Sequence, residues 1–384
     1  MSEDAPVNTD AADAPGFARA YVAVRRMQAK LHCWAVADGD RRFDDLYNLV
    51  CDPAFLRLAW ERVAGNQGAR TPGVDRATVA GITAGIGVEA FLCQVRDQLR
   101  SRTFVPVPVR QVMIPKASGK LRKLGIPTVT DRVVQAALKL VLEPVFEATF
   151  QSCSYGFRPN RRAADAIAEI HHFTSKRYEW VLEADIEACF DMIDHVALMD
   201  RLRDRISDKR VLALVKAFLK AGVMTTTGSV EGTITGTPQG GILSPLLANI
   251  ALSILDDEFA RRWNQDMANE VQRQRRRRKG QANYRLIRYA DDFVIVVTGQ
   301  REDAEQLRDE VAAVIAPMGL RLSPDKTRVV HIDDGFDFLG FNIRRMRKRG
   351  SNKSFVYTRP SKKSIASIKA RVKTMTYRNT LHRD

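Results

Sequence analysis

The chain has 384 residues, of which 45% are apolar, so it is long enough for two domains or for one multi-lobed domain with a real core. Its net charge of +16 indicates a polyanionic partner, either nucleic acid or an acidic membrane surface. No apolar run approaches the roughly 20 residues of a membrane span, and the five cysteines are odd in number without a CxxC pair, which argues against a membrane protein, a zinc site and a disulfide framework.

The N-terminal part of the chain is predicted to be a disordered tail followed by helices. Residues 1–18 are acidic with little to bury, and they lack the basic and apolar regions of a signal peptide, so we expect a cytoplasmic protein without disulfide partners. Apolar residues spaced by three or four predict a helix over 20–35. A second helix is expected over 43–49, and Asp52-Pro53 has the cap and first-turn residues that begin a third.

A basic hairpin is predicted between residues 105 and 127. Its prolines fit an edge strand, and Ser118-Gly119 forms the turn. Lys116 and Arg122 lie near the tip together with two further lysines. The hairpin is either a solvated edge that its charges protect from aggregation, or a clamp for a triphosphate in which Lys is a point charge and Arg a fork.

An aromatic, arginine-rich turn precedes a strand that ends in an acid. Arg158 and Arg161 lie in the segment SYGFRPNRRA, after a long helix predicted over 128–150, and such interleaving of aromatic and Arg side chains suits contacts with nucleic acid. The apolar run 178–186 predicts a buried strand, in which Asp185 is unfavourable unless it is paired or metal-bound.

Two further segments suggest ligand contacts. Residues 236–241 (GTPQGG) combine small residues with the amide of Gln239 before an apolar helix over 243–262; small residues there allow close approach of a ligand, although such a start is more often only a turn. The run 273–279 is usually a solvated loop, but in so basic a chain we expect nucleic-acid contact. The arginines expected to make it are Arg275, Arg276, Arg277 and Arg278.

The adjacent acids Asp291 and Asp292 lie between two runs of β-branched and aromatic residues. The runs 284–288 and 293–297 predict two strands joined by a tight turn. Alone, the pair favours a solvated turn, where acids are common. Adjacent acids repel each other, however, and become favourable when a divalent cation lies between them and a third acid. Asp185 supplies the third carboxylate of the predicted metal site.

The C-terminal part is predicted to contain a helix over 302–318, a tight hairpin over 335–341 and a final helix over 361–375. The final helix carries an apolar stripe with basic residues outside it. The stripe has no later partner in the sequence, so we expect that it packs back or that a domain is missing.

The order of these motifs resembles a reverse transcriptase, and the flanking sequences resemble bacterial group II intron-encoded reverse transcriptases, the intron maturases. The resemblance extends over about residues 25–375. The segments that carry it are RMQAKLHCW, FDDLYNLV, IPKASGKLRKLGIPTVTDRVVQAAL, SYGFRPNRRA, GTPQGGILSPLLANI, RYADDF, LSPDKT and FDFLGF. A single YADD is a weak signal, whereas several motifs in the order of the family are specific.

The resemblance implies an α+β right-hand polymerase fold, with fingers, a palm built on an antiparallel sheet, and a helical thumb. It implies that Asp185, Asp291 and Asp292 are the catalytic carboxylates, which hold two Mg²⁺ ions with Mn²⁺ as an alternative. The residues implied to bind the incoming nucleotide are Lys116, Arg122, Phe190, Gln239 and Lys326. Among them Phe190 matches the steric gate under the sugar. The residues matching the primer grip are Phe338, Leu339 and Gly340.

The resemblance also predicts a domain layout. We expect a disordered tail at 1–18, an N-terminal helical extension and the start of the fingers at 19–104, a fingers–palm domain at 105–345, and the incomplete basic start of the thumb at 346–384. Family members continue into a full thumb and often into a DNA-binding or endonuclease region, so we expect this chain to be truncated in the thumb.

The predicted function is RNA-directed DNA polymerisation for a group II intron, with a role in intron RNA binding, splicing and mobility. The predicted partners are an RNA template and intron RNA, a DNA primer or target, and deoxynucleoside triphosphates. Three alternatives remain: an RNA-binding maturase with weak or lost polymerase activity, an RNA-dependent RNA polymerase, and a reverse transcriptase recruited for host defence.

Overall fold

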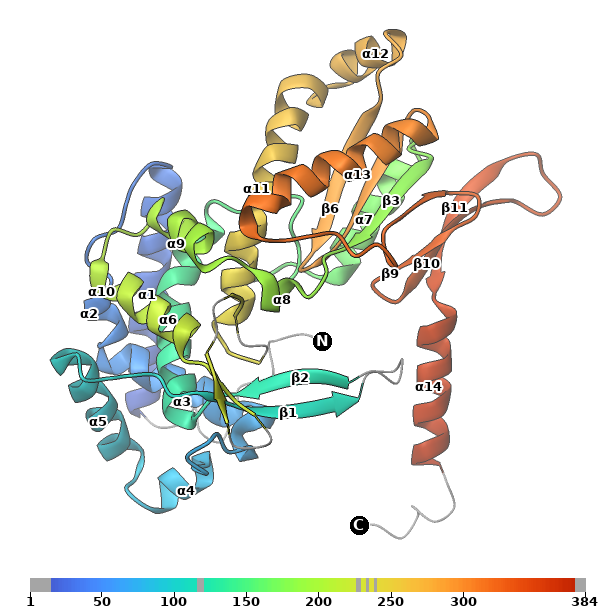
Figure 1. The fold of residues 1–384 in the computed structure, drawn as a ribbon. Coiled ribbons are helices and arrows are strands. Elements are labelled where there is room, and N and C mark those ends of the chain that lie inside the picture. The colour runs from blue at the N-terminus through green and yellow to red at the C-terminus, as the bar shows by residue number, and fades with distance from the viewer. Residues whose placement is uncertain (1–14, 116–120, 226–228, 233–234, 238–239, 377–384) are drawn as a thin grey trace. The chain divides into compact units, whose positions relative to one another are not determined.

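The computed structural model describes residues 15–115, 121–225, 229–232, 235–237 and 240–376 (Figure 1). The chain divides into two compact units, each built from segments that are distant in sequence. The first unit comprises Met1–Phe150, Glu187–Ile254 and Ile315–Leu320, and the second comprises Gln151–Ile186, Leu255–Val314 and Arg321–Asp384. The domain boundaries expected from the sequence stay a prediction.

The first unit is mainly helical. Helix α6 lies at its centre because it is apolar on almost every side, and α1, α2 and α3 pack against it. The helices of this unit are α1 (Pro15–Ala37), α2 (Tyr47–Val50), α3 (Pro53–Gly65), the 3₁₀ helix η2 (Gln67–Arg70), α4 (Val79–Ala84), α5 (Val88–Ser101), α6 (Val129–Glu147), α8 (Cys189–Met192), α9 (His195–Arg203), α10 (Lys209–Lys220), the first part of α11 (Ser244–Arg262) and the 3₁₀ helix η4 (Ala316–Met318). Helix α1 begins at Pro15, so residues 15–18 of the predicted tail are helical.

A small sheet completes the first unit. Its strands are β1 (Val109–Pro115), β2 (Leu121–Ile126), β4 (Val223–Met224) and β5 (Val230–Glu231), in the order β2-β1-β4-β5. The predicted basic hairpin is confirmed, since β1 and β2 pair antiparallel up to Pro115 and Leu121. The expectation of an edge strand is wrong for β1, which also pairs with β4. An inner position is possible for β1 because Pro106 and Pro108 lie before the strand and remove no backbone N–H donor from its ladder.

The second unit contains two sheets. The four-stranded sheet has the order β6-β7-β3-β8, all antiparallel, and the three-stranded sheet has the order β11-β10-β9. The strands are β3 (Trp180–Asp185), β6 (Asn283–Tyr289), β7 (Asp292–Thr298), β8 (Arg328–His331), β9 (Phe336–Phe338), β10 (Phe341–Arg347) and β11 (Ser354–Pro360). The helices are α7 (Ala163–Thr174), the rest of α11, the π-helix η3 (Trp263–Met267), α12 (Glu270–Arg278), α13 (Arg301–Ile315) and α14 (Lys362–Met375).

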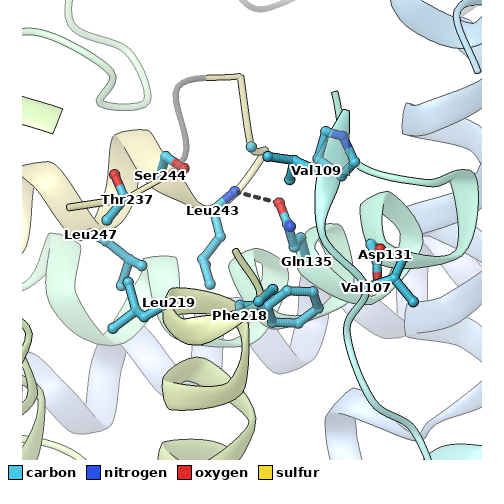
Figure 2. A pocket seen from close by; sticks show the side chains of 13 residues that line it. Val107, Val109, Asp131, Gln135, Phe218, Leu219, Thr237, Leu243, Ser244 and Leu247 are labelled. Atoms are coloured by element: carbon cyan, nitrogen blue, oxygen red, sulfur yellow. Dashed lines mark hydrogen bonds between the residues drawn. The ribbon is translucent and has the colours of Figure 1, made fainter. Parts of the chain in front are cut away.

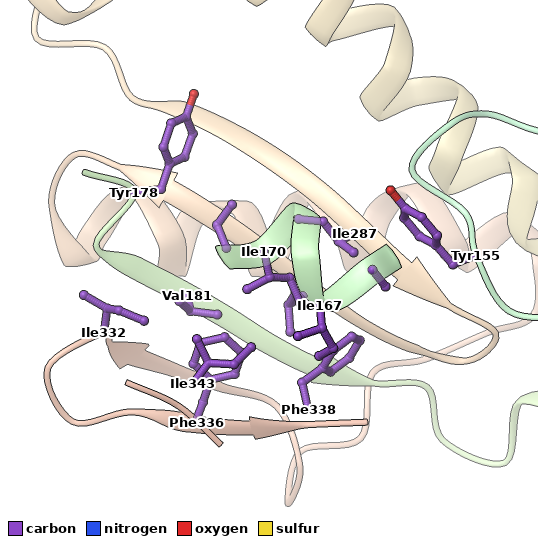
Figure 3. Packing of buried hydrophobic residues seen from close by; sticks show 13 residues of the cluster. Tyr155, Ile167, Ile170, Tyr178, Val181, Ile287, Ile332, Phe336, Phe338 and Ile343 are labelled. Atoms are coloured by element: carbon purple, nitrogen blue, oxygen red, sulfur yellow. The ribbon is translucent and has the colours of Figure 1, made fainter. Parts of the chain in front are cut away.

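The core of the second unit connects both sheets with α7 (Figure 3). Ile167 and Ile170 of α7 pack with Val181 of β3, Phe336 of β9 and Ile343 of β10 in one cluster of buried side chains. Strand β7 is buried along its whole length after Asp292, as expected for an inner strand covered on both faces. In the part of the chain that the structure describes, no helix is long and apolar enough to cross a membrane.

Asp208 connects α10 to the segment that begins α2. The carboxylate is buried; it accepts hydrogen bonds from the Leu46 and Tyr47 amides at 3.0 and 2.8 Å and caps α10 at Arg210 N, 2.9 Å away. Burial alone would raise its pKa, but the hydrogen bonds from Arg210 and from these amides outweigh burial and hold the pKa below its ordinary value. The charged form therefore stabilises the folded state.

We expect Asp208→Asn to lower the free energy of unfolding at neutral pH by about 2 kcal/mol, because charge-assisted hydrogen bonds are lost. A carboxyl with a lowered pKa contributes stability above its unfolded pKa of about 4, and this contribution disappears as the pH falls through the folded pKa. The variant should thus lose less stability than the wild type on acidification below about pH 4. Urea unfolding at several pH values measures both effects, with the exposed Asp204→Asn as control. Equal acid sensitivity of the wild type and Asp208→Asn would contradict this assignment.

Candidate active site

Two adjacent acids form the turn between β6 and β7. Tyr289 and Asp292 are the last Cα partners of this hairpin, so only Ala290 and Asp291 reverse the chain. Ala290 takes a left-handed conformation with φ of 58°, which costs about 1–3 kcal/mol for a residue other than glycine. The apolar runs on both sides belong to buried strands, so the reversal is confined to this short link. The predicted tight turn is confirmed.

Asp185 lies beside this turn. It ends β3, and its Cα partner in the antiparallel register is Asp292 of β7. Its carbonyl oxygen accepts a hydrogen bond from Ser323 N at 2.8 Å, which fixes the chain as it leaves the strand. The carboxylate forms an ion pair with Lys326, whose Nζ lies 2.7 Å from Oδ2. The structure thus brings Asp185, Asp291, Asp292 and Lys326 to one end of the sheet.

The electrostatics of this group follow from its crowding. The pKa of Asp292 is raised to about 7, by the protein packed around its carboxyl, by the charges of Asp291 and Asp185, and by a hydrogen bond with Asp185. Asp292 is nevertheless exposed, so water reaches it and weakens the effect of burial on its pKa. The neighbouring carboxylates are the better-supported cause of the raised pKa, because the strand register places Asp185 opposite Asp292. The hydrogen bond to Asp185 raises the pKa of Lys326, which therefore stays charged.

The donor set suits a hard divalent cation, because carboxylate oxygens are its preferred ligands. Within the described residues, no group of three or more acidic, His or Cys side chains converges closely enough to hold a metal in this conformation. Instead, the ammonium of Lys326 lies on Asp185 where a cation would bind. The backbone positions fit the metal site predicted from the sequence, and the side chains have to turn toward a common point to complete it.

Residues outside the motif support the turn. Gly156 packs so closely against it that an added Cβ would overlap the Ala290 amide nitrogen and lie 2.9 Å from the Tyr289 carbonyl carbon. The guanidinium of Arg288 is fully buried and donates from Nη1 to the Ala290 carbonyl oxygen at 2.8 Å. Sequence reasoning did not identify either residue. The signal for Arg288 was available, since a charge inside an apolar strand needs a buried partner.

Phe190, the predicted steric gate, belongs to the first unit. It lies in α8 and is half-buried, two residues after Ala188, which has a left-handed φ of 44°. The Phe190 carbonyl oxygen accepts a hydrogen bond from Thr237 N and would lie 2.6 Å from a Cβ on Gly236. His195 Nε2 donates to the Gly236 carbonyl oxygen at 2.6 Å. The start of the GTPQGG segment is therefore attached to the backbone of Phe190.

The residues directly after this segment are hydrogen-bonded to α6 (Figure 2). Oε1 of Gln135 accepts hydrogen bonds from Ile242 N at 2.9 Å and from Leu243 N at 3.5 Å. Gln135, Thr237 and Leu243 line a small cavity in the first unit. Sequence analysis did not select Gln135, because its side chain bonds to residues more than 100 positions later in the chain.

Two of the predicted nucleotide-binding residues, Lys116 and Gln239, lie outside the described residues. Arg122 is described and exposed on β2, where it is the Cα partner of Ile114. The role of all three stays a prediction.

The predicted nucleic-acid contacts differ in accessibility. Arg158 is buried and donates from Nη1 to the carbonyl oxygens of Gln151 and Ser154 at 2.6 and 2.8 Å, so it stabilises its own turn. Arg161 is half-buried, with its guanidinium 5.3 Å from the centre of the Tyr155 ring.

The Arg run forms helix α12 rather than the expected loop. Asn269 and Gln272 cap its start reciprocally, and Glu270 pairs with Arg277 at 2.6 Å. Arg276 donates from Nη2 to the Ala282 carbonyl oxygen at 2.8 Å, so this guanidinium closes the end of the helix. Arg275 is exposed, and so is Arg278.

The predicted primer grip lies between β9 and β10, as the expected tight hairpin. The Phe338 side chain is buried in the core, whereas Leu339 has a left-handed φ of 48° and Gly340 is exposed. The Gly340 carbonyl oxygen accepts hydrogen bonds from Ser361 N and Ser364 Oγ at the start of α14. The Phe338 ring is therefore not accessible to a ligand in this structure, and the primer-grip role of the three residues stays a prediction.

Comparison with known proteins identifies the family. Residues 114–343 match the family described as reverse transcriptase (RNA-dependent DNA polymerase). The chain belongs to the reverse transcriptase family. With this match and the antiparallel sheets of the second unit, the predicted α+β right-hand polymerase fold is confirmed. Reverse transcriptases use divalent metal ions, in agreement with the carboxylates of the second unit.

The individual relatives confirm the resemblance to group II intron proteins. This reverse transcriptase is 37% identical to protein YkfC of Escherichia coli K12, over 89% of this chain and 93% of that protein. It is 34% identical to the group II intron-encoded protein LtrA of Lactococcus lactis over 82% of this chain, but spans only 59% of LtrA. Among solved structures, telomerase from Candida tropicalis with a fragment of telomeric RNA is 14% identical, with a TM-score of 0.46 over 67% of this chain and 47% of that one.

We expect Gly156→Ala to lower the free energy of unfolding by about 1–3 kcal/mol, because the new methyl group overlaps the backbone at Tyr289 and Ala290 and forces the turn to shift. Gly39→Ala is the matched control, since nothing lies within 4 Å of its Cβ position. Denaturant unfolding of both variants measures the difference, and equal stability of the two would contradict the close packing at Gly156.

Proposed function

We propose that this reverse transcriptase is the RNA-directed DNA polymerase of a group II intron and adds deoxynucleotides to the 3′ end of a primer on an RNA template. The observation that carries the proposal is the register of β3 and β7, which sets Asp185 opposite Asp292 beside Asp291. The similarity to the intron-encoded LtrA supports intron RNA as a partner. The proposed fingers–palm domain, 105–345, encloses the matched family region.

The proposed catalytic residues act through negative charge. Asp185 and Asp291, with Asp292 beside them, would hold two Mg²⁺ ions, or Mn²⁺ in their place. When bound, these ions supply the positive charge that activates the primer 3′-hydroxyl and stabilises the leaving pyrophosphate. The protein itself orients the reactants, which is the larger part of phosphoryl-transfer catalysis.

Other residues would bind the nucleotide. Lys326 already carries its charge beside Asp185 and can turn toward a triphosphate, because its side chain is 65% exposed. Lys116 and Arg122 of the basic hairpin would supply further positive charge, and Gln239 would lie beside the incoming base. Phe190 would exclude a 2′-hydroxyl, since its backbone is fixed by Thr237 and Gly236.

The nucleic acid would be held by exposed basic residues. Arg275 and Arg278 of α12 support this, since both are exposed on a helix whose other arginines close or pair within it. In a chain with a net charge of +16, such contacts would make RNA binding strongly salt-dependent.

We expect Asp291→Ala to reduce primer extension on an RNA template by about 100-fold or more, while RNA binding is retained, because the substitution removes charge only at the catalytic turn. The exposed Asp309→Ala of α13 is the control and should behave as wild type. Extension with Mg²⁺ and filter binding of labelled RNA give the two readouts.

The same experiment tests the alternative of an RNA-binding maturase. If the wild type and Asp291→Ala both give background extension while both bind RNA, the polymerase proposal fails and the binding function replaces it. The basic surface is the observation that favours this alternative.

We expect Phe190→Ala to raise ribonucleotide incorporation relative to deoxynucleotide incorporation by at least about tenfold, because removal of the ring makes room for a 2′-hydroxyl. Single-nucleotide extension with each sugar measures the ratio, and Phe355→Ala, an exposed ring of β11, serves as control. Unchanged sugar discrimination would refute the assignment of the gate. A natural preference for ribonucleotides in the wild type would instead favour an RNA-dependent RNA polymerase.

A further inference from the structure

Arg288 is the largest fully buried charged side chain of the second unit. It lies on β6 directly before the catalytic turn, and its exposure is 0%. Nε donates to Oδ1 of Asp256 at 2.8 Å, and Nη2 donates to the other carboxylate oxygen, so the two planar groups meet in a bidentate pair. Asp256 lies in the part of α11 that belongs to this unit and is also 0% exposed.

The same guanidinium reaches beyond this partner. Nη1 donates to the Ala290 carbonyl oxygen at 2.8 Å, and Nη2 donates to Ser154 Oγ at 2.7 Å. One rigid group therefore links α11, the segment before α7 and the catalytic turn. Lys could not replace it, because a single ammonium lacks the fixed fork that bonds in several directions at once.

The backbone strengthens this arrangement. Arg288 N donates to the Cys153 carbonyl oxygen at 2.8 Å, and Tyr155 N donates back to the Arg288 carbonyl oxygen at 2.8 Å. This short pairing brings Gly156 against Ala290. The left-handed Ala290 is thus enclosed from one side by Gly156 and bonded from the other by Arg288. A strained residue persists only where its surroundings determine its conformation in this way.

We propose that the buried Arg288–Asp256 pair is a positioning device, which holds the Ala290 link so that Asp291 and Asp292 bind divalent cations tightly. The inference rests on the proposed metal site of the catalytic carboxylates. Neither residue of the pair touches the reacting atoms. Their effect passes through the Ala290 carbonyl oxygen, in the way that partners of metal ligands orient those ligands.

A purely structural role makes a different prediction from a positioning role. Removing one member of a buried ion pair leaves an unpaired charge and destabilises the fold, whereas replacing both by apolar residues of similar volume is often neutral or stabilising. The double variant Arg288→Met/Asp256→Leu therefore keeps the packing while it deletes the bond to Ala290. If the pair served stability alone, this variant would bind metal as the wild type does.

The matched control changes another ion pair of the same strand. Arg285 of β6 pairs with Glu169 of α7 at 2.8 Å, the two side chains are 14% and 15% exposed, and neither bonds to the turn. Arg285→Met/Glu169→Leu removes an equal number of charges from the unit. Its Mn²⁺ affinity should equal that of the wild type.

The experiment is Mn²⁺ binding followed by the electron paramagnetic resonance signal of the free ion, with thermal unfolding of each variant in parallel. We expect Arg288→Met/Asp256→Leu to melt within a few degrees of the wild type and to bind Mn²⁺ about 10- to 100-fold more weakly. An intact fold with unchanged Mn²⁺ affinity would overturn the proposal.

Two additional variants keep the result decisive. If the double variant does not fold, Arg288→Lys, which retains the charge but not the fork, takes its place, and wild-type Mn²⁺ affinity in that folded variant would overturn the proposal equally. Asp291→Ala separates the proposal from its premise. If Asp291→Ala binds Mn²⁺ as tightly as the wild type, the proposed metal site itself is wrong. If Asp291→Ala loses Mn²⁺ affinity while Arg288→Met/Asp256→Leu and Arg288→Lys do not, only the positioning role is rejected.

Discussion

The antiparallel pairing of β3 with β7 is the constraint on which the candidate site depends. It sets Asp185 opposite Asp292 and so concentrates negative charge at the end of one sheet. Such crowding is unfavourable without a cation, and Lys326 offsets part of it through its ion pair with Asp185. Because successive strand residues face opposite sides, a shift of one residue in this pairing would move Asp185 to the other face. The apolar core on both sides of β7 prevents that shift.

In both units, a loop that carries predicted functional residues is held by residues outside the loop itself. In the second unit, Gly156 and Arg288 hold the turn of Asp291 and Asp292. In the first, Gln135 holds the residues that directly follow the GTPQGG segment. The bonds that Arg288 and Gln135 make to these two regions go to backbone atoms. The geometry of each loop is therefore determined by its main chain.

The sequence predicted those features that depend on local pattern. The hairpin around Asp291 followed from two β-branched runs, and the N-cap of α3 followed from Asp52. Burial of individual polar residues could not be predicted in the same way. Arg158 looked like a contact for nucleic acid, yet it bonds to carbonyl groups of its own turn. Which side of a turn faces the core depends on elements that are distant in sequence, and no local pattern encodes that.

The same limit explains α12. Its arginines predicted a solvated loop, because like charges repel along a helix. The capping pair of Asn269 and Gln272, together with Glu270, offsets that repulsion. These three side chains were visible in the sequence, but their stabilising effect on the helix depends on the reciprocal capping geometry of a helix start.

The ion pair of Lys326 with Asp185 has a consequence for the sequence in which ligands arrive. A divalent ion that binds Asp185 has to compete with an amine that is already there, so binding is an exchange between an internal and an external cation. The exchange is facile, because exposed ion pairs are weak and are screened by salt. Before this exchange, the ammonium reduces the negative potential at the end of the sheet. A phosphate backbone that approaches the metal-free protein therefore meets less repulsion than three carboxylates without a counter-charge would produce.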